Sequence, residues 1–420
     1  MKRLRLPART GYDLALLSVV VGLLAIGLAM VYSASGIKAL DALDDPRYFL
    51  VQQAAWAAIG LVAMLVVARI DYHRYRALAL PVVVVAVLLL IVVLVPGIGT
   101  RVGGASRWLR ISSFAGLQPA ELAKLALVLY LAFWLAGKGD RVGRWSVTLP
   151  FVAILSLVAA LVVAEPDLGT AIVLVAVGLA MYFAAGARVA EFAALGGLAT
   201  VCVAAVAVVQ PYRLARLATF LDPWRDPQGA GFQTIQSIFG LALGGPFGEG
   251  LGAGKEKFGF LPAPYTDSIF AVLGDELGLL GTLTVVVLFL VIAFKGIRIA
   301  LAAPDAAGAL LATGLTVWLV FQAWVNMAVV AALVPLTGIT LPFISYGGSS
   351  ICVGLVAVGI LLNVGRQAVG HVEDRGSVPG PARRRGDRRA RQPAPRGRGS
   401  ARGADDGRAS VHRGTSRSRG

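Results

Sequence analysis

Residues 77–95 read ALALPVVVVAVLLLIVVLV, a run of nineteen residues without a charged side chain. A helix needs about 20 mainly apolar residues to cross the hydrocarbon core of a bilayer. Runs of this kind recur over the first 365 residues, and the whole chain is 57% hydrophobic and only 15% charged. A soluble domain carries about 25% charged residues. The composition therefore excludes a soluble enzyme and predicts an integral membrane protein.

Ten apolar runs predict an all-α bundle of ten transmembrane helices. Their expected bounds are 12–34, 49–68, 77–95, 117–136, 147–164, 168–185, 189–209, 268–294, 306–330 and 347–364. The first run is longer than the core of a signal peptide, which has about 7–15 residues, so we expect it to stay in the protein as an anchor. The largest connection, 210–267, joins the seventh and eighth runs.

The distribution of Lys and Arg predicts the orientation of the bundle. Short connections with an excess of these residues stay in the cytoplasm. With the N-terminus inside, the cytoplasmic segments before the tail hold 13 Lys and Arg, whereas the short outer connections hold five. Both termini are therefore predicted to be cytoplasmic, and the large connection is predicted to lie outside.

The chain divides into a membrane domain, 1–365, and an Arg-rich tail, 366–420. The tail has 15 Arg and five acidic residues, so it carries +10 of the formal net charge of +16. This composition predicts a disordered segment, with attraction to anionic lipid headgroups as the alternative. Nucleic-acid binding is not expected, because the tail has no aromatic residue for stacking. Two lone cysteines and three scattered histidines predict neither a disulfide framework nor a His-based metal centre.

Charged residues at the ends of the apolar runs mark candidate sites. Glu121 and Lys124 begin the fourth run and lie three residues apart, on one helical face. Two interpretations stay open for them, namely an ion pair that ties two helices together or a pair that faces a substrate. The connection 165–170 reads EPDLGT. Its Asp167 either caps a helix or points into an outer cavity.

The large connection is rich in glycine between 244 and 259 and contains Lys255. A glycine-rich loop with lysine suits an anionic group such as a diphosphate, but the pattern of a nucleotide P-loop is not present. Asp267 ends this connection, where it either caps the eighth run or takes part in catalysis. Asp275 and Glu276 follow deeper in that run, and both structural pairing and a functional role stay open for them.

The last connection, 334–350, reads VPLTGITLPFISYGGSS. Its two prolines and three glycines exclude a continuous helix. Irregular backbone at membrane depth survives only inside protein or beside a water-filled cavity. We therefore predict a re-entrant or broken segment beside the outer cavity, with an exposed turn as the alternative.

Seven stretches, in their order along the chain, resemble the SEDS proteins, the family of FtsW, RodA and SpoVE. They are 106–108, 118–124, 165–170, 219–224, 231–237, 261–278 and 335–350. The resemblance covers about residues 10–367. Within the family, 338–343 is similar to the FtsW and SpoVE branch, because RodA proteins more often have Pro at the position of Thr340. The resemblance therefore implies a role in cell division, with a RodA-type role in elongation as the alternative.

The resemblance implies a peptidoglycan glycosyltransferase that polymerises lipid II at the outer leaflet of the bacterial plasma membrane. The family's essential aspartate corresponds to Asp267, and its polar pair corresponds to Glu121 and Lys124. The aspartate of its Pro-Asp-Leu-Gly-Thr motif corresponds to Asp167.

The chain departs from the family pattern at several positions. Ala120 replaces the usual Ser, and Glu165 replaces the usual Gln. Residues 263–265 replace the more common Glu-x-His. Because a Glu and a His are missing so close to Asp267, the acid–base role falls on Asp267 itself.

The implied reaction is a single inverting displacement that releases undecaprenyl diphosphate. We expect Asp267 to be the general base and Lys124 to supply positive charge to the departing diphosphate. Glu121 and Asp167 are expected to orient Lys124 or to hold a metal ion. Substrate binding is expected of Arg107, Trp108, Arg216, Lys255, Thr266, Ser345 and Tyr346.

The resemblance implies lipid II as substrate, and a penicillin-binding transpeptidase and other division proteins as partners at the division septum. No cofactor is assigned, and a divalent cation, Mg²⁺ or Mn²⁺, is the open alternative. Two other functions are weighed against polymerisation. A lipid II flippase needs polar groups along its whole route, whereas the matched groups here cluster at the outer ends of the runs. A non-catalytic scaffold for the transpeptidase would dispense with Asp267.

Overall fold

The computed structural model describes residues 13–102, 105–110, 116–258, 261–262 and 264–376. Its last helix continues to Gly376, past the predicted domain boundary at 365. The rest of the predicted tail, 377–420, lies outside the described residues, as does the start of the first predicted run.

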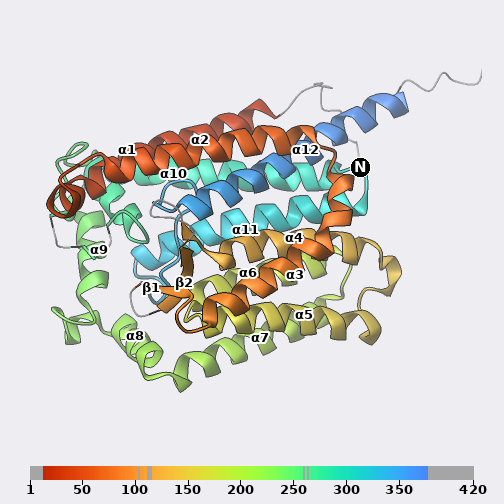
Figure 1. The fold of residues 1–420 in the computed structure, drawn as a ribbon, viewed down its shortest axis with the longest axis horizontal. Coiled ribbons are helices and arrows are strands. Elements are labelled where there is room, and N and C mark those ends of the chain that lie inside the picture. Colours follow the sequence, from red (N-terminus) through yellow and green to blue (C-terminus); the bar gives the residue numbers. More distant parts are fainter. Residues whose placement is uncertain (1–12, 103–104, 111–115, 259–260, 263, 377–420) are drawn as a thin grey trace, which may run out of the picture. The chain divides into compact units, whose positions relative to one another are not determined.

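Helices make up most of the described chain (Figure 1). They are α1 (Leu14–Leu43), α2 (Tyr48–Arg69), α3 (Tyr75–Leu94), α4 (Pro119–Ala136), α5 (Trp145–Ala164), α6 (Leu168–Ala184), α7 (Val189–Val209), α8 (Pro211–Leu221), α9 (Phe232–Leu243), α10 (Ile269–Ala302), α11 (Ala306–Val330) and α12 (Gly348–Gly376). Three short 3-10 helices, η1 (Tyr72–Arg74), η2 (Gly139–Arg141) and η3 (Pro223–Arg225), lie in the connections. Within the part of the chain that the structure describes, nine helices are long and apolar enough to cross a membrane. The chain is a multi-pass membrane protein.

The sixth predicted run forms a shorter helix than the others. Helix α6 has 17 residues, which at about 1.5 Å per residue gives about 25 Å, against a hydrocarbon core of about 30 Å. Its start is determined locally, because Pro166 takes a positive φ of 30° and Asp167 caps the first turn. Nine helices of spanning length and the shorter apolar helix α6 thus occupy the positions of the ten predicted spans within the described residues.

A small sheet lies in the connection between α3 and α4, which the prediction of an all-α fold did not include. Strands β1 (Gly99–Val102), β2 (Ala105–Arg110) and β3 (Gly116–Leu117) pair antiparallel in the order β1-β2-β3. Strands of two to six residues are too short for a period-two pattern to show clearly in the sequence. The sheet leads directly into α4.

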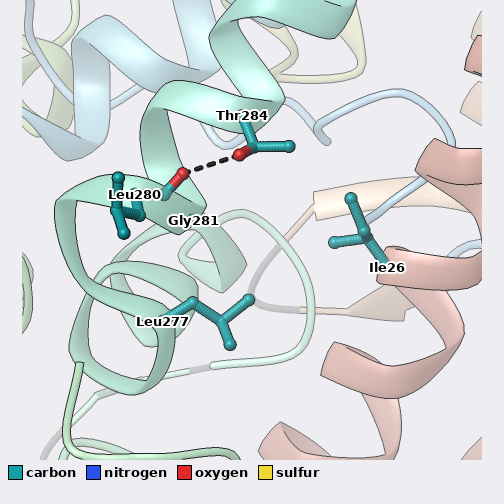
Figure 2. A pocket seen from close by; sticks show the side chains of 5 residues that line it. All are labelled: Ile26, Leu277, Leu280, Gly281 and Thr284. Carbon is teal, nitrogen blue, oxygen red and sulfur yellow. Dashed lines mark hydrogen bonds between the residues drawn. The ribbon is translucent and has the colours of Figure 1, made fainter. Parts of the chain in front are cut away.

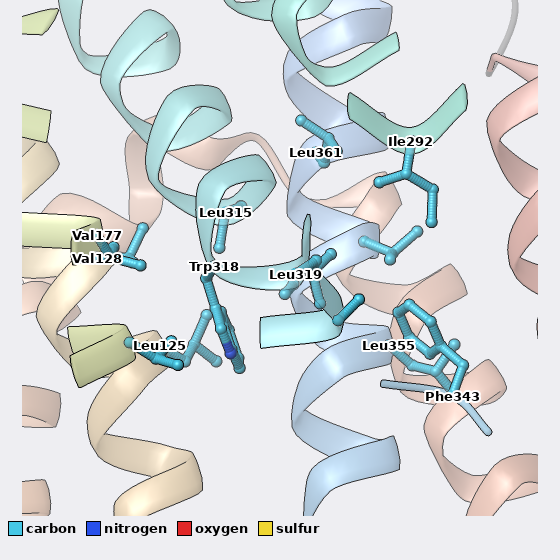
Figure 3. Close-up of a cluster of buried hydrophobic side chains, with 14 of the residues drawn as sticks. Leu125, Val128, Val177, Ile292, Leu315, Trp318, Leu319, Phe343, Leu355 and Leu361 are labelled. Carbon is cyan, nitrogen blue, oxygen red and sulfur yellow. The ribbon is translucent and has the colours of Figure 1, made fainter. Parts of the chain in front are cut away.

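The interior of the bundle is formed mainly by α4, α11 and α12. Most residues of their apolar windows are buried, whereas α7 has no buried residue and packs mainly along α6 and α8. Figure 3 shows the core, where Trp318 of α11 is buried among apolar side chains that include Leu125 of α4. Phe343, from the connection between α11 and α12, packs in the same cluster.

Helix α10 is broken at Gly278, which has φ 64° and ψ −160°. The glycine-rich part of the large connection packs against this break. The Leu279 amide donates to the Gly245 carbonyl at 2.8 Å, and the Gly250 amide donates to the Glu276 carbonyl at 3.1 Å. A Cβ atom at residue 278 would overlap the Gly248 backbone, so only glycine fits this approach.

A cavity of about 280 Å³ lies beside the break, between α1 and α10 (Figure 2). It is lined by Ile26, Leu277, Leu280, Gly281 and Thr284. The Thr284 hydroxyl donates to the Leu280 carbonyl at 2.7 Å, which leaves the lining largely apolar. None of the residues predicted to form the site lines this cavity.

Candidate active site

Asp267 lies in a turn of residues 265–268 that precedes α10, and this segment is called the Asp267 turn below. Helix α10 begins after Ser268, so the Asp267 carboxylate stands before the cap position. Its Oδ1 accepts from the Thr266 hydroxyl at 3.1 Å, and its Oδ2 accepts from Gln233 Nε2 at a long 3.4 Å. The residue as a whole is partly exposed. The sequence left two roles open for Asp267, namely helix capping and catalysis. This geometry does not fit capping, because Ser268 occupies the cap position.

The surroundings of Asp267 favour its protonated form more than water does. Burial raises the pKa of the Asp267 carboxyl, while hydrogen bonds from Thr266 and Gln233 and the charge of Arg216 oppose the rise. A carboxylate with a raised pKa is a stronger base near neutral pH. Arg216, on α8, donates from Nη1 to the Leu336 carbonyl at 3.0 Å and lies 4.6 Å from the Tyr212 ring.

The connection between α11 and α12, called the broken segment below (331–347), has no helix or strand. It is buried at Leu341, Phe343 and Ser345. The irregular backbone agrees with the prediction of a broken segment, and the burial of these three residues does not fit the alternative of an exposed turn. The Ser345 hydroxyl donates to the Thr266 carbonyl at 2.6 Å and accepts from the Leu341 amide at 2.8 Å.

Aromatic side chains surround the same turn. The Tyr346 amide donates to the Tyr265 carbonyl at 2.9 Å, and its hydroxyl donates to Gln52 Oε1 at 2.5 Å. The Tyr265 ring stacks on Phe49 with ring centroids 4.9 Å apart, and Lys38 Nζ lies 5.4 Å from the Tyr265 ring. Three predicted site residues, Thr266, Ser345 and Tyr346, are therefore brought together with Asp267.

Glu121 and Lys124 form a buried ion pair on α4, with 4% and 2% of their surfaces exposed. Lys124 Nζ donates to Glu121 Oε1 at 2.8 Å and to Gln322 Oε1 of α11 at 2.6 Å. Nζ also lies 5.1 Å from the Trp318 ring. This geometry matches an ion pair that ties two helices together, because each of these contacts of the ammonium group is made with a side chain of α4 or α11.

Two amide side chains of α11, Gln322 and Asn326, were missed by the sequence analysis. Gln322 Nε2 donates to the Thr340 carbonyl at 3.0 Å, and Asn326 Nδ2 donates to the Asp267 carbonyl at 2.9 Å. Both are buried. Two amides four residues apart in an apolar helix lie on one face, and this spacing is the signal that could have indicated them.

Asp167 has the geometry of a helix cap. Its Oδ1 accepts from the Thr170 amide at 3.1 Å and its Oδ2 from the Thr170 hydroxyl at 3.0 Å. Arg107 Nε donates to the Glu165 carbonyl at 3.1 Å, and its Nη2 donates to the Pro166 carbonyl. The two residues thus meet at the connection between α5 and α6, where both are engaged by protein.

Glu165 is fully buried in this connection, and neither of its carboxylate oxygens has a hydrogen-bond partner among the described residues. Burial raises the pKa of the Glu165 carboxyl to about 8, with the charge of Asp167 adding to the rise and that of Arg107 opposing it. Glu165 is therefore mainly neutral at pH 7. A protonated Glu has nearly the shape of the Gln that the family usually has here.

The remaining predicted residues, Lys255 and Trp108, belong to other segments than the Asp267 turn. Lys255 is exposed in the glycine-rich stretch, and the Trp108 ring packs over Gly116 in the small sheet. The buried lysine of the stretch is Lys257, whose Nζ lies 2.7 Å from Glu276 Oε1. Structural pairing, one of the two alternatives for Glu276, fits this contact.

No group of three or more His, Cys, Asp or Glu residues within the described ranges is arranged to hold a metal ion. Among the carboxylates, Asp167 is engaged in a helix cap and Glu276 in an ion pair. The described residues therefore do not fit a divalent-cation site made of protein ligands alone.

Known proteins share both the sequence and the fold. A family model for FtsW, RodA and SpoVE, described as cell cycle protein, matches residues 14–369. A probable peptidoglycan glycosyltransferase FtsW from Trichlorobacter lovleyi is 45% identical over 363 residues, which cover 86% of this chain and 95% of that protein. Stage V sporulation protein E from Bacillus subtilis is 42% identical over 361 residues, which cover 85% and 98%.

A solved structure is similar over the same region. Its subject is the structural coordination of polymerization and crosslinking by a peptidoglycan synthase complex. The similar chain in that complex is 31% identical, with a TM-score of 0.70, and the match covers 85% of this chain and 98% of that chain. Because the family model spans most of the chain and the fold agrees, this protein belongs to the FtsW, RodA and SpoVE family of cell cycle proteins.

Proposed function

We propose that the chain is a peptidoglycan glycosyltransferase that polymerises lipid II during cell division. The observation that carries the proposal is Asp267, a partly exposed residue whose carboxyl has a raised pKa and feels the positive charge of Arg216. The names of the relatives support the same activity, since the FtsW protein of Trichlorobacter lovleyi is a probable peptidoglycan glycosyltransferase.

In the proposed reaction, Asp267 takes the proton from the 4-hydroxyl of the acceptor GlcNAc. The oxygen of this hydroxyl then attacks C1 of the donor MurNAc, and the bond from C1 to the diphosphate breaks. The donor's α linkage becomes a β linkage, and undecaprenyl diphosphate leaves with the electron pair of the broken bond. A positioned base contributes about 10²–10⁴-fold to such a step.

Positive charge near the departing diphosphate lowers the barrier. Arg216 is the best-placed candidate, because its charge acts on Asp267 and its guanidinium is only partly buried. Lys255 is exposed and can reach a ligand from the glycine-rich stretch. Lys124 is saturated by Glu121 and Gln322, so we assign it to holding α4 against α11. We derive no step through a divalent cation.

We further propose that both termini are cytoplasmic, that the Asp267 turn faces the outer leaflet, and that the protein acts at the division septum. A penicillin-binding transpeptidase is the proposed partner. The similar chain from a peptidoglycan synthase complex supports this part of the proposal, because that complex coordinates polymerization with crosslinking.

The test uses the full chain, purified in mild detergent with its cognate transpeptidase, and fluorescent lipid II. Wild-type protein is expected to produce a ladder of glycan strands on a gel, and Asp267→Ala is expected to produce none. A ladder from both proteins would keep the activity and remove Asp267 as the base. If neither produces a ladder while liposomes containing the protein move labelled lipid II between leaflets, the function is that of a flippase.

A further inference from the structure

The Asp267 carboxylate is held only weakly by side chains. Among the described side chains, the neighbouring Thr266 donates one hydrogen bond to it, and the bond from Gln233 is long at 3.4 Å. Its position is therefore determined mainly by the backbone of the Asp267 turn. The question is what holds that backbone.

Three consecutive carbonyls of the turn are each held by a donor from elsewhere in the chain. The Tyr265 carbonyl accepts from the Tyr346 amide, and the Thr266 carbonyl accepts from the Ser345 hydroxyl. The Asp267 carbonyl accepts from Asn326 Nδ2 at 2.9 Å. Two of these donors belong to the broken segment, which has no regular structure of its own, and only Asn326 belongs to a helix.

Asn326 also holds the broken segment. Its Nδ2 donates a second hydrogen bond, at 2.8 Å, to the Ile339 carbonyl. The side chain is 1% exposed, so water does not replace these bonds, and an irregular carbonyl left unpaired inside a membrane protein costs several kcal/mol. One amide group thus anchors both the turn that carries Asp267 and the segment that supplies the turn's two other donors.

Gln322, one helical turn earlier on α11, binds the broken segment in the same way. Its Nε2 donates to the Thr340 carbonyl at 3.0 Å, while its Oε1 accepts from Lys124 Nζ and from Trp318 Nε1. The broken segment is therefore attached to α11 at two successive carbonyls, Ile339 and Thr340. Of these two side chains, Asn326 also donates a hydrogen bond to the Asp267 carbonyl.

We propose that Asn326 is a positioning residue for Asp267, which sets the distance between the Asp267 carboxylate and the acceptor hydroxyl by binding the Asp267 and Ile339 carbonyls together. The inference rests on the proposed glycosyltransferase function. Asn326 acts through the backbone and does not touch the substrate. Its loss should therefore lower the rate of the chemical step and leave substrate binding nearly unchanged.

The chain offers a matched control in Asn363 of α12. This asparagine is also fully buried, and its Nδ2 donates to the Ala68 carbonyl at 2.8 Å while its Oδ1 accepts from the Tyr72 amide at 3.0 Å. It thus binds the backbone of a connection just as Asn326 does. Unlike Asn326, it makes no hydrogen bond to the Asp267 turn within the described ranges. Asn363→Ala should cost a similar amount of stability without affecting Asp267.

The experiment measures kcat and KM for lipid II polymerisation by the full chain with its transpeptidase, together with the thermal midpoint of each variant. Asn326→Ala is expected to lower kcat by about 10- to 100-fold, the effect of a displacement of about 1 Å. KM should change by no more than about threefold, because ground-state binding is retained. Asn363→Ala should keep the wild-type kcat at a comparable thermal midpoint. Asn326→Asp, which keeps the size but removes both donors, should lose kcat as Asn326→Ala does.

The outcomes separate the inference from the proposed function. If the wild type polymerises lipid II and the Asn326 and Asn363 variants have the same kcat, the inference is overturned and the function stands. A rise in KM with unchanged kcat would also overturn it. If both Asn326 variants fail to fold while Asn363→Ala folds, the residue is structural. A wild type that makes no glycan overturns the function, and the inference with it.

Discussion

Asp267 and Asp305 each precede a helix of the same bundle, but they are held in opposite ways. Asp305 accepts from the Gly308 amide at 2.7 Å and from the Tyr72 hydroxyl at 2.9 Å, and His73 Nε2 lies 2.8 Å from its Oδ2. Burial alone would raise the pKa of Asp305, but these hydrogen bonds outweigh it and lower the pKa. The pKa of Asp267 is raised instead.

The difference shows how the protein separates structural carboxylates from reactive ones. Around Asp305 the donors reach the carboxylate itself, so the charge is stabilised and its reactivity is low. Around Asp267 the donors from Asn326, Ser345 and Tyr346 reach the backbone carbonyls of the turn. The turn is thereby held in place without strong hydrogen bonds to the carboxylate oxygens themselves. This contrast is the physical reason why we assign chemistry to Asp267 and a structural role to Asp305.

The largest expected effect tests this contrast directly. Asp267→Asn should lower kcat for polymerisation by about 10²–10⁴-fold and leave the thermal midpoint nearly unchanged, because the amide oxygen can keep the bond from Thr266 and only the long bond from Gln233 is lost. Asp305→Asn should do the reverse, lowering the thermal midpoint and leaving kcat alone. Glycan gels and thermal unfolding in the same detergent measure both. A similar loss of kcat in the two variants would break the comparison.

The second prediction concerns the buried pair of Lys124 and Glu121. Lys124→Met leaves the Glu121 carboxylate buried without its partner, and removing one member of a buried pair costs about 3–5 kcal/mol. The thermal midpoint should fall accordingly. Adding Glu121→Gln should recover most of the loss, since no charge is then left unpaired.

Activity of the double variant of Lys124 and Glu121 sharpens the assignment. A structural tie predicts that polymerisation returns together with stability. If stability returns and polymerisation does not, Lys124 contacts the substrate, and the role expected from the family resemblance is correct.

The third prediction is a change of stability with pH at Glu165. Because the pKa of this carboxyl is raised from its usual 4.5 to about 8, the folded protein binds more protons than the unfolded chain between these values. Stability should therefore fall as the pH rises from about 5 to about 8, by at most about 1.4 kcal/mol per pH unit. Glu165→Gln should remove this slope in thermal unfolding and keep polymerisation. If the stability of the variant still falls with rising pH, another titratable group is responsible for the slope.

The smallest effect is expected at Asp71, which contacts His73 on the side opposite to Asp305. Burial opposes the shift, but hydrogen bonds from His73 and Gln367 lower the pKa of Asp71 to about 2. Its stabilisation is present above the usual value of 3.8 and is lost as the pH falls toward 2. Asp71→Asn should flatten the decline of the thermal midpoint between pH 5 and pH 3. The change should be slight, because half of the Asp71 side chain is exposed.

Much of the fold could be predicted because hydrophobic runs depend on local composition alone. The runs at 49–68 and 306–330, for example, correspond closely to α2 and α11. The break near Pro335 and Pro342 was predictable for the same reason, since proline cannot continue a helix. The sheet around Trp108 was missed, because its strands are short and are stabilised by their pairing.

Part of the candidate site could not be predicted from the sequence. Gln322 and Asn326 are ordinary polar residues in an apolar run, and their importance comes from carbonyls that lie far from them in the chain, at Thr340 and Asp267. Similarly, both Lys255 and Lys257 stand in the glycine-rich stretch, but only Lys257 pairs with a buried carboxylate. Sequence spacing cannot distinguish such partners.

The membrane-crossing runs, the positions of the helices and the aspartate after the large connection could all be predicted, because each of these depends on neighbouring residues. Which polar groups are satisfied depends on the folded structure. It pairs Lys124 with Gln322, leaves the Glu165 carboxylate without a hydrogen-bond partner among the described residues, and holds Asp267 through Asn326. The reason is that pKa values and hydrogen bonding inside a protein depend on burial and on groups brought together from distant parts of the chain.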